Sequence, residues 1–174
     1  MFGMTILTTG VLAREPDTVS AVANIVNFDN SISRLVTVEV WDWSSYDSPV
    51  QVPVLIGENV PVAFPYLLEP NHLAVMYADL NAANVSLYEM RIIYTIGADI
   101  VTNCFGRSQP PYASQEGNTV YQKQLVSLKP SALSMAQLLA MQVRLGRITL
   151  EQVASHFGAA SAFYKQLVAL VRPS

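Results

Sequence analysis

The sequence predicts a mainly β protein, an antiparallel, jelly-roll-like β-sandwich of about eight strands with a C-terminal appendage of two or three short helices. Apolar residues alternate with a period of two from about residue 4 to residue 128, and turn-forming residues interrupt them. After Lys129-Pro130 the period changes to about 3.6. Residues 1–130 carry six basic and twelve acidic residues, whereas residues 131–174 carry four basic residues and one acidic residue. We therefore expect a sandwich domain over 1–130 and a helical segment over 131–174.

The expected strands are short runs with alternating apolar residues, bounded by clusters of Asn, Asp, Gly, Pro and Ser. Prolines cannot donate to a sheet ladder, so Pro53, Pro61 and Pro65 predict an edge strand or a broken strand. The longest loop is expected over Gly106–Asn118. The strands predicted by this pattern are Thr5–Leu12, Thr18–Phe28, Arg34–Trp43, Val50–Ile56, Val60–Phe64, Leu73–Asp79, Tyr88–Ile96, Ile100–Phe105 and Thr119–Leu128.

Three helices are expected near the C-terminus. Ser134 followed by Gln137, and Thr149 followed by Gln152, have the spacing of a capping box. The first helix should run over 132–145 and stop at Gly146, and the second should stop at Gly158. Such short helices are not stable alone, so they must pack on each other, on the sheet or on a neighbouring chain. Apolar spacing predicts the third helix through Phe163, Tyr164, Leu167, Val168 and Val171.

The composition is unusually apolar. Of the 174 residues, 51% are hydrophobic and only 13% are charged, about half of the usual charged share. Mean hydropathy is +0.30. No apolar run approaches the ~20 residues that cross a bilayer, so we expect no membrane insertion. The apolar residues must lie in a core or in contacts between chains, and the sequence therefore predicts a homo-oligomer.

The N-terminus, MFGMTILTTGVLAREP, has no basic region ahead of its short apolar stretch. This predicts synthesis in the cytoplasm without a secretory signal peptide. A single cysteine, Cys104, allows no internal disulfide and no cysteine-based zinc site. A net charge of -3 gives no general case for nucleic acid binding, and four scattered cations in the helical segment are too few for a DNA-reading helix.

No residues form a recognisable catalytic, metal or cofactor site. His72 and His156 are expected at the surface. Cys104 is expected to be a buried structural residue, and the alternative is a disulfide between two chains if it faces outward. The chain contains no glycine-rich phosphate loop and no G-x-S-x-G motif. We expect a protein that is not an enzyme and has no cofactor, although two carboxylates could still meet in space. The acidic residues follow no metal-ligand spacing; they include Asp42, Asp47, Asp79, Glu89 and Asp99.

The stretch LVTVEVWDWS, residues 35–44, raises a question about its two tryptophans. In a strand, the valines Val36, Val38 and Val40 share one face, so Trp41 and Trp43 lie on the other. One interpretation is that a helix or loop of the same chain covers them, or that a bulge turns them inward. The other is that they lie between subunits, where aromatic residues are favoured.

The primary hypothesis is a non-enzymatic structural subunit that self-assembles through apolar sheet faces and the helical segment. The expected interface residues are Trp41, Trp43, Leu138, Met141, Phe163 and Leu167. The alternative is a ligand-binding sandwich, a carbohydrate-binding module or lectin, in which exposed aromatic rings stack on sugars. Its candidate residues are Trp41, Trp43, Tyr46 and Tyr66, with Asp42 or Asp47 as polar partners.

In the order of several short stretches along the chain, the sequence resembles small Firmicute spore-surface proteins of the exosporium and of spore appendages. The resemblance covers roughly residues 20–128 and implies a self-assembling structural subunit at the spore surface, in contact with copies of itself, with other surface-layer proteins or with glycans. Appendage subunits of that group usually carry an N-terminal extension with cysteines that cross-link neighbouring subunits, and the sequence contains no such cysteines, since its one cysteine is Cys104. The matching stretches are Asn24–Asn27, Val36–Trp43, Tyr88–Arg91, Asn103–Arg107, and Gly117–Val120 through Leu125-Val126.

Overall fold

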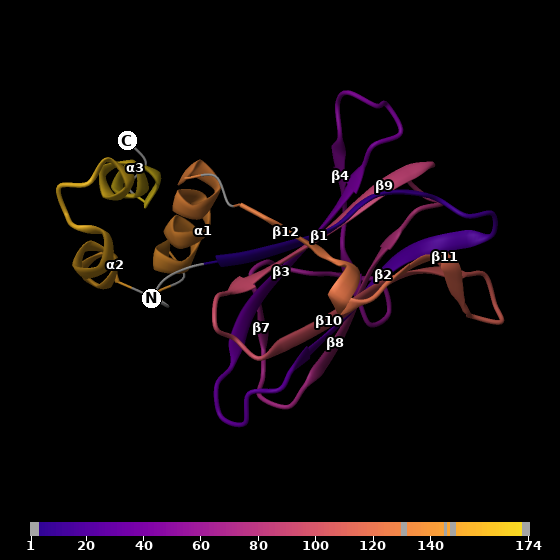
Figure 1. Ribbon diagram of the computed structural model, residues 1–174, viewed down its shortest axis with the longest axis horizontal. Helices are drawn as coiled ribbons and strands as arrows, with labels where there is room; N and C mark the ends of the chain where they lie inside the picture. Colours follow the sequence, from indigo (N-terminus) through magenta and orange to yellow (C-terminus); the bar gives the residue numbers. More distant parts are fainter. Residues whose placement is uncertain (1–3, 130–131, 145, 147–148, 172–174) are drawn as a thin grey trace. The chain divides into compact units, whose positions relative to one another are not determined.

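The computed structural model describes residues 4–129, 132–144, 146 and 149–171 of the chain, without the side chains of residues 132–135, 138, 141, 155–157 and 163. The described residues are mainly β, with two antiparallel sheets followed by three helices late in the chain (Figure 1). The chain divides into two compact units. One unit is Thr5–Leu128, which contains both sheets, and the other contains the helices.

The first sheet has the strand order β12-β1-β9-β3-β4, and β7 also pairs with β3. Strands β3 and β9 form its centre. They pair without a break from Val36 opposite Tyr94 to Asp42 opposite Tyr88, so no bulge turns the tryptophans of this segment inward. The strands are β1 (Met4–Ala13), β3 (Arg34–Asp42), β4 (Val50–Val52), β7 (Tyr66–Leu68), β9 (Leu87–Thr95) and β12 (Val126–Leu128).

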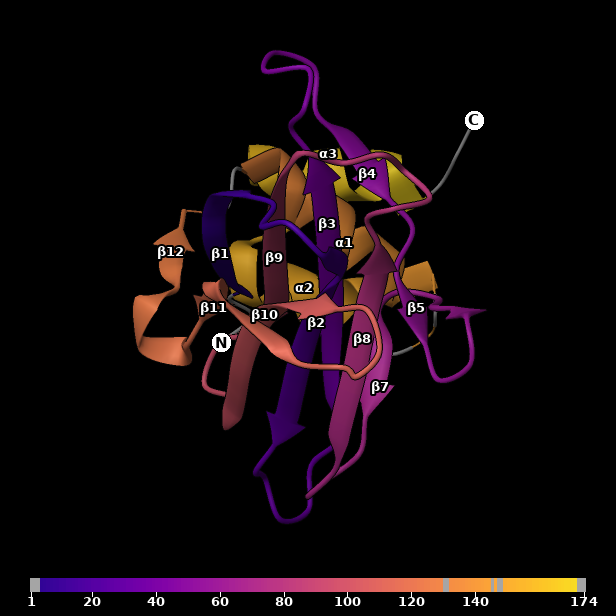
Figure 2. The same cartoon turned by 90° about the vertical axis from the view of Figure 1, so that its right-hand side faces the viewer.

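The second sheet has the strand order β11-β10-β2-β8-β5-β6. Figure 2 shows its long central strand β2 with β10 and β8 on its two sides. The β2–β8 register is continuous from Ser20 opposite Asp79 to Val26 opposite Leu73. The strands are β2 (Thr18–Asn27), β5 (Leu55–Ile56), β6 (Val60–Pro61), β8 (Leu73–Asp79), β10 (Ile100–Ser108) and β11 (Ser114–Val120).

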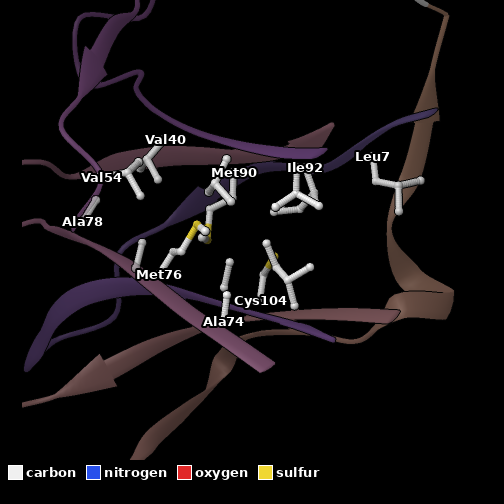
Figure 3. Packing of buried hydrophobic residues seen from close by; sticks show 14 of the residues in the cluster. Leu7, Val40, Val54, Ala74, Met76, Ala78, Met90, Ile92 and Cys104 are labelled. Carbon is white, nitrogen blue, oxygen red and sulfur yellow. The ribbon is translucent and has the colours of Figure 1, made fainter. Parts of the chain in front are cut away.

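The two sheets share one hydrophobic core. Figure 3 shows Val40, Met90 and Ile92 of the first sheet pointing toward Met76 and Cys104 of the second. The inward residues of β3 are Val36, Val38 and Val40, as the alternation predicts, and none of them is exposed. Burial of the apolar side chains of this core, the three valines among them, is the main stabilising contribution to the unit of two sheets.

The helical unit has a small core of its own, built from Ala136, Leu139, Val153 and Leu167. Its helices are α1 (Ala132–Arg144), α2 (Leu150–Phe157) and α3 (Ala162–Val171). Positive φ angles of 68° at Gly146 and 83° at Gly158 follow α1 and α2, as expected for glycines that end helices.

One of the two predicted capping boxes is confirmed. The Gln152 amide donates to Thr149 Oγ1 at 3.1 Å, and the Thr149 amide donates to Gln152 Oε1 at 2.8 Å. The other is wrong because α1 already begins at Ala132, which places Ser134 inside the helix rather than before it.

The structure also corrects several strand predictions. The predicted loop over 106–118 is largely an antiparallel hairpin, because β10 continues to Ser108 and β11 begins at Ser114. The predicted strand over 50–56 is divided at Pro53 into β4 and β5, which belong to different sheets. The predicted strand over 60–64 keeps only Val60–Pro61, as expected for a segment rich in proline. The predicted strand over 119–128 is interrupted by a 3₁₀ turn at Gln122–Gln124.

Candidate functional site

The two tryptophans lie on the outer face of the first sheet, in a cluster that we call the tryptophan–carboxylate cluster: Trp41, Trp43, Glu39, Glu89 and Arg91. The β3–β9 register places Glu39 opposite Arg91 and Trp41 opposite Glu89, and residues in such cross-strand pairs interact directly. The Arg91 guanidinium lies over the Trp41 ring, 5.3 Å from its centroid. Strand pairing therefore assembles this cluster from segments about fifty residues apart.

Both indole N–H groups donate to carboxylates. Trp41 Nε1 donates to Glu39 Oε2, and Trp43 Nε1 donates to Glu89 Oε2, each at 2.9 Å. Each tryptophan is half-buried. Because the polar edge of each ring is already satisfied, only the ring faces remain for other contacts. These contacts hold the tryptophans in place on the outer side of the sheet.

Glu89 lies at the centre of the cluster, with a side chain that is only 7% exposed. Oε1 accepts hydrogen bonds from Thr8 Oγ1 at 2.6 Å and from Arg91 Nε at 2.9 Å. Oε2 accepts from Arg91 Nη2 at 2.8 Å in addition to the Trp43 indole. Burial raises the pKa of Glu89, but the hydrogen bonds from Arg91, Thr8 and Trp43 outweigh it and leave the pKa below its ordinary value. Glu89 is therefore a carboxylate with both oxygens engaged in hydrogen bonds.

The four residues of the alternative ligand platform do not form one surface. Tyr46 is 81% exposed in the turn after β3. Tyr66 instead pairs with the inward-facing Val36 and packs against the core. Asp42 accepts hydrogen bonds from the Ser44 amide and hydroxyl, and so braces the same turn. The structure therefore brings Trp41 and Trp43 together without Tyr66.

The helical residues of the predicted interface are only partly described. Leu167 is fully buried in the core of the helical unit. The side chains of Leu138, Met141 and Phe163 lie outside the described residues. The interface prediction for these three residues is not tested.

The outer face of the second sheet carries an apolar surface that we call the aliphatic patch: Val26, Leu73, Val75 and Val101. The registers place Val26 of β2 between Leu73 of β8 and Val101 of β10, so these three side chains form one row across three strands. Leu73 is 56% exposed, Val75 38% and Val101 37%, while Val26 is half-buried. The sequence analysis missed this patch because the outer face of β2 mixes the polar Ser20 and Asn24 with Val22 and Val26, so alternation alone does not mark Val26 as a surface residue.

At the opposite end of β2, β8 and β10, the outer face of the second sheet contains a pocket. An open pocket of about 520 Å³ lies over Ser20, Tyr77 and Arg107, between the turn of the β5–β6 hairpin and the turn of the β10–β11 hairpin. The second turn contributes Tyr112, which falls in the segment predicted to be a loop. The signal that could have indicated this site is the pair of Arg107 and Tyr112 within that polar segment.

Cys104 and His72 lie outside both the tryptophan–carboxylate cluster and the pocket. Cys104 is fully buried, as predicted, and burial raises the pKa of its thiol to about 12. His72 is exposed, as expected, and its Nδ1 is hydrogen-bonded to the Pro70 carbonyl at 2.7 Å. The His156 side chain lies outside the described residues. Among the described residues, no group of three or more His, Cys, Asp and Glu side chains is placed to bind a metal ion.

None of the described helices has the length and apolar character needed to cross a membrane. No family model matches the chain, and neither the curated proteins nor the solved structures contain a significant match to it.

Proposed function

We propose that this chain is a non-enzymatic structural subunit that associates with copies of itself, as a cell-surface or spore-surface layer or appendage requires. The proposal includes a β-sandwich of the jelly-roll kind for the unit of two sheets. The observation that carries it is the aliphatic patch on the outer face of the second sheet. The resemblance of several sequence stretches within residues 20–128 to those of spore-surface proteins supports the same function.

The patch fits a protein contact because its side chains are aliphatic, adjacent and held on a regular sheet. Full burial of a valine or leucine contributes about 1.5–3 kcal/mol, and these side chains are already part-buried, so each would add about 1 kcal/mol. Leu73 would contribute most to such a contact, because it is the most exposed of the four side chains, and Val75 and Val101 would follow with similar exposure. Adjacent exposed apolar residues of this kind typically mark interaction surfaces.

A second copy of the chain is the partner that the chemistry of the patch favours. A two-fold contact brings the same surface together from both subunits, so a charged patch would repel itself. The aliphatic patch contains no charged side chain. The outer face of the first sheet is less suitable, because covering Glu39 and Arg91 would remove charged groups from water.

The test is the mass of the chain in solution, measured by sedimentation at several concentrations for three proteins. The unmodified chain should gain mass as its concentration rises. Val101→Glu places a carboxylate in the patch of each subunit and should keep the chain at its monomer mass of 19.1 kDa. Val50→Glu is the matched control, because Val50 is a 65% exposed valine on the other sheet, and it should associate like the unmodified chain.

Association of Val101→Glu equal to that of the unmodified chain would contradict the proposed contact. Circular dichroism of all three proteins checks that the substitutions leave the fold intact. The substitution sites are exposed, so we expect identical spectra.

A further inference from the structure

The pocket on the second sheet is built where three neighbouring strands carry polar residues in one row. Ser20 of β2 lies opposite Asp79 of β8 on one side and opposite Arg107 of β10 on the other. Asn59 and Tyr112 approach this row from the two hairpin turns. The pocket volume of about 520 Å³ falls in the range of small-molecule sites.

Arg107 is held rigidly in this pocket. Its Nε donates to Ser20 Oγ at 3.1 Å. Its guanidinium lies over the Tyr77 ring at 5.1 Å from the centroid and over the Tyr112 ring at 4.9 Å. Cation–π contacts with two rings fix the plane of the guanidinium. Within the described residues its two terminal nitrogens have no hydrogen-bond partner, so up to four N–H donors remain for a ligand.

The other groups of the pocket are also positioned before a ligand arrives. The Tyr77 hydroxyl accepts from the Asn59 amide at 3.0 Å, and its single hydrogen has two acceptors within reach, Gly57 O at 3.0 Å and Asn59 Oδ1 at 2.9 Å, which ties the β5–β6 turn to β8. Asp79 Oδ1 accepts the amides of Asn81 and Ala82, both at 2.9 Å. The second Asp79 oxygen has no hydrogen-bond partner among the described residues. The pocket therefore offers fixed donors and a fixed acceptor side by side.

The charge of the pocket distinguishes between ligand classes. Arg107 is its one cationic lining residue among those described, and Asp79 and Glu58 are carboxylates, so the lining carries a net negative charge. A phosphate or nucleotide would be repelled by the two carboxylates, and a metal ion would be repelled by Arg107. A neutral ligand with several hydroxyl groups can accept from Arg107 and donate to Asp79 at once.

We propose that this pocket binds a neutral carbohydrate, with sugar hydroxyls on Arg107 and Asp79 and the sugar ring against Tyr112. Tyr112 is 67% exposed, so its side chain remains accessible to a ligand. The site is independent of self-association, because the aliphatic patch lies at the other end of the same strands. It also differs from the platform predicted from sequence, which places sugars on Trp41, Trp43, Tyr46 and Tyr66.

The experiment is a titration of the intact, ¹⁵N-labelled chain with neutral oligosaccharides (maltohexaose, cellohexaose and chitohexaose), followed by ¹H–¹⁵N correlation spectra. At least one of these glucan or chitin fragments should shift the Arg107 Nε–H signal and the amides of Asn59 and Asn81. Tyr112→Ala should weaken that binding about tenfold or more, because the ring face and one support of Arg107 are both removed.

Tyr46→Ala is the matched control, since Tyr46 is a more exposed tyrosine in a turn of the other sheet, and it should bind like the unmodified chain. The proposal is overturned if no neutral sugar at about 20 mM shifts the pocket signals. It is equally overturned if Tyr46→Ala rather than Tyr112→Ala loses binding. Inorganic phosphate is a further probe. A shift of the Arg107 signal by phosphate and by none of the sugars would show an anion site and overturn the proposal.

Discussion

Replacing Glu89 with glutamine is the substitution that tests the tryptophan–carboxylate cluster most sharply. The two oxygens of Glu89 accept four hydrogen bonds, from Thr8, Trp43 and twice from Arg91. Glutamine keeps the shape but removes the charge and converts one acceptor into a donor. Placed on the Thr8 side, its NH₂ group can donate to the hydroxyl but faces Arg91 Nε, which then loses its acceptor.

The expected loss of stability follows from these contacts. Hydrogen bonds to a charged group contribute about 1.5–3 kcal/mol each, and a neutral amide retains part of this. Arg91 is 28% exposed, so water can replace some of its lost contacts. We therefore expect Glu89→Gln to lower the free energy of unfolding by about 2–3 kcal/mol at pH 7, below the ~3–5 kcal/mol for breaking a fully buried ion pair.

The same substitution carries a pH signature. The pKa of Glu89 is lowered in the folded protein, so its stabilising effect is present above the unfolded pKa of about 4.3 and is lost as pH falls through the folded pKa. The difference between the unmodified chain and Glu89→Gln should therefore be full at neutral pH and shrink as the pH falls below the unfolded pKa of about 4.3 and through the lower folded pKa.

Urea denaturation followed by tryptophan fluorescence measures this difference, since both tryptophans lie in the unit of two sheets. Glu116→Gln is the control, because Glu116 is exposed on β11 and has no hydrogen bond among the described residues; it should change stability by less than about 0.5 kcal/mol. A Glu89→Gln protein as stable as the control at pH 7 would refute the reasoning. A loss of stability as large in acid as at pH 7 would refute it as well.

Three further substitutions or measurements test the packing. Tyr88→Phe should be neutral or stabilising by up to about 1 kcal/mol in the same denaturation assay, because the buried Tyr88 hydroxyl has no hydrogen-bond partner among the described residues. A clear loss of stability would contradict this and reveal a hydrogen bond to the hydroxyl. Gly106→Ala should lower the free energy of unfolding by about 1–3 kcal/mol, since a Cβ there would lie 2.8 Å from Thr18 Cγ2 and 2.9 Å from Asn118 Cβ. An unchanged melting temperature would disprove this close approach. Cys104 should react with a thiol reagent only after unfolding, because it is fully buried with a pKa raised to about 12; rapid labelling of the native chain would contradict its place in the core.

The sequence predicted best the strands with one buried face. In β3 the alternation of valines with polar residues assigned Val36, Val38 and Val40 to the core and the tryptophans to the outside, and both assignments are confirmed. The same rule did not orient β2 clearly, because its outer face carries Val22 and Val26 beside the polar Ser20 and Asn24, whereas Ala23 faces the core. Periodicity separates the faces of a strand only when one of them is polar.

What the sequence could not predict depends on pairing between distant segments. Glu89 reaches Trp43 only because β9 pairs with β3 in one particular register. The β10–β11 hairpin was missed because residues 114–118, SQEGN, have low strand propensity, although edge position and pairing with β10 hold them in the sheet. The pocket around Arg107 depends on that hairpin, so Arg107 and Tyr112 could mark the segment in the sequence, but only the pairing places them beside Ser20 and Tyr77.

The mass of the intact, unmodified chain by light scattering, measured over a wide range of concentrations, is the most direct test of the proposed self-association. The account predicts a mass that rises with concentration toward a multiple of 19.1 kDa. A mass that remains at that of one chain at every concentration would contradict it.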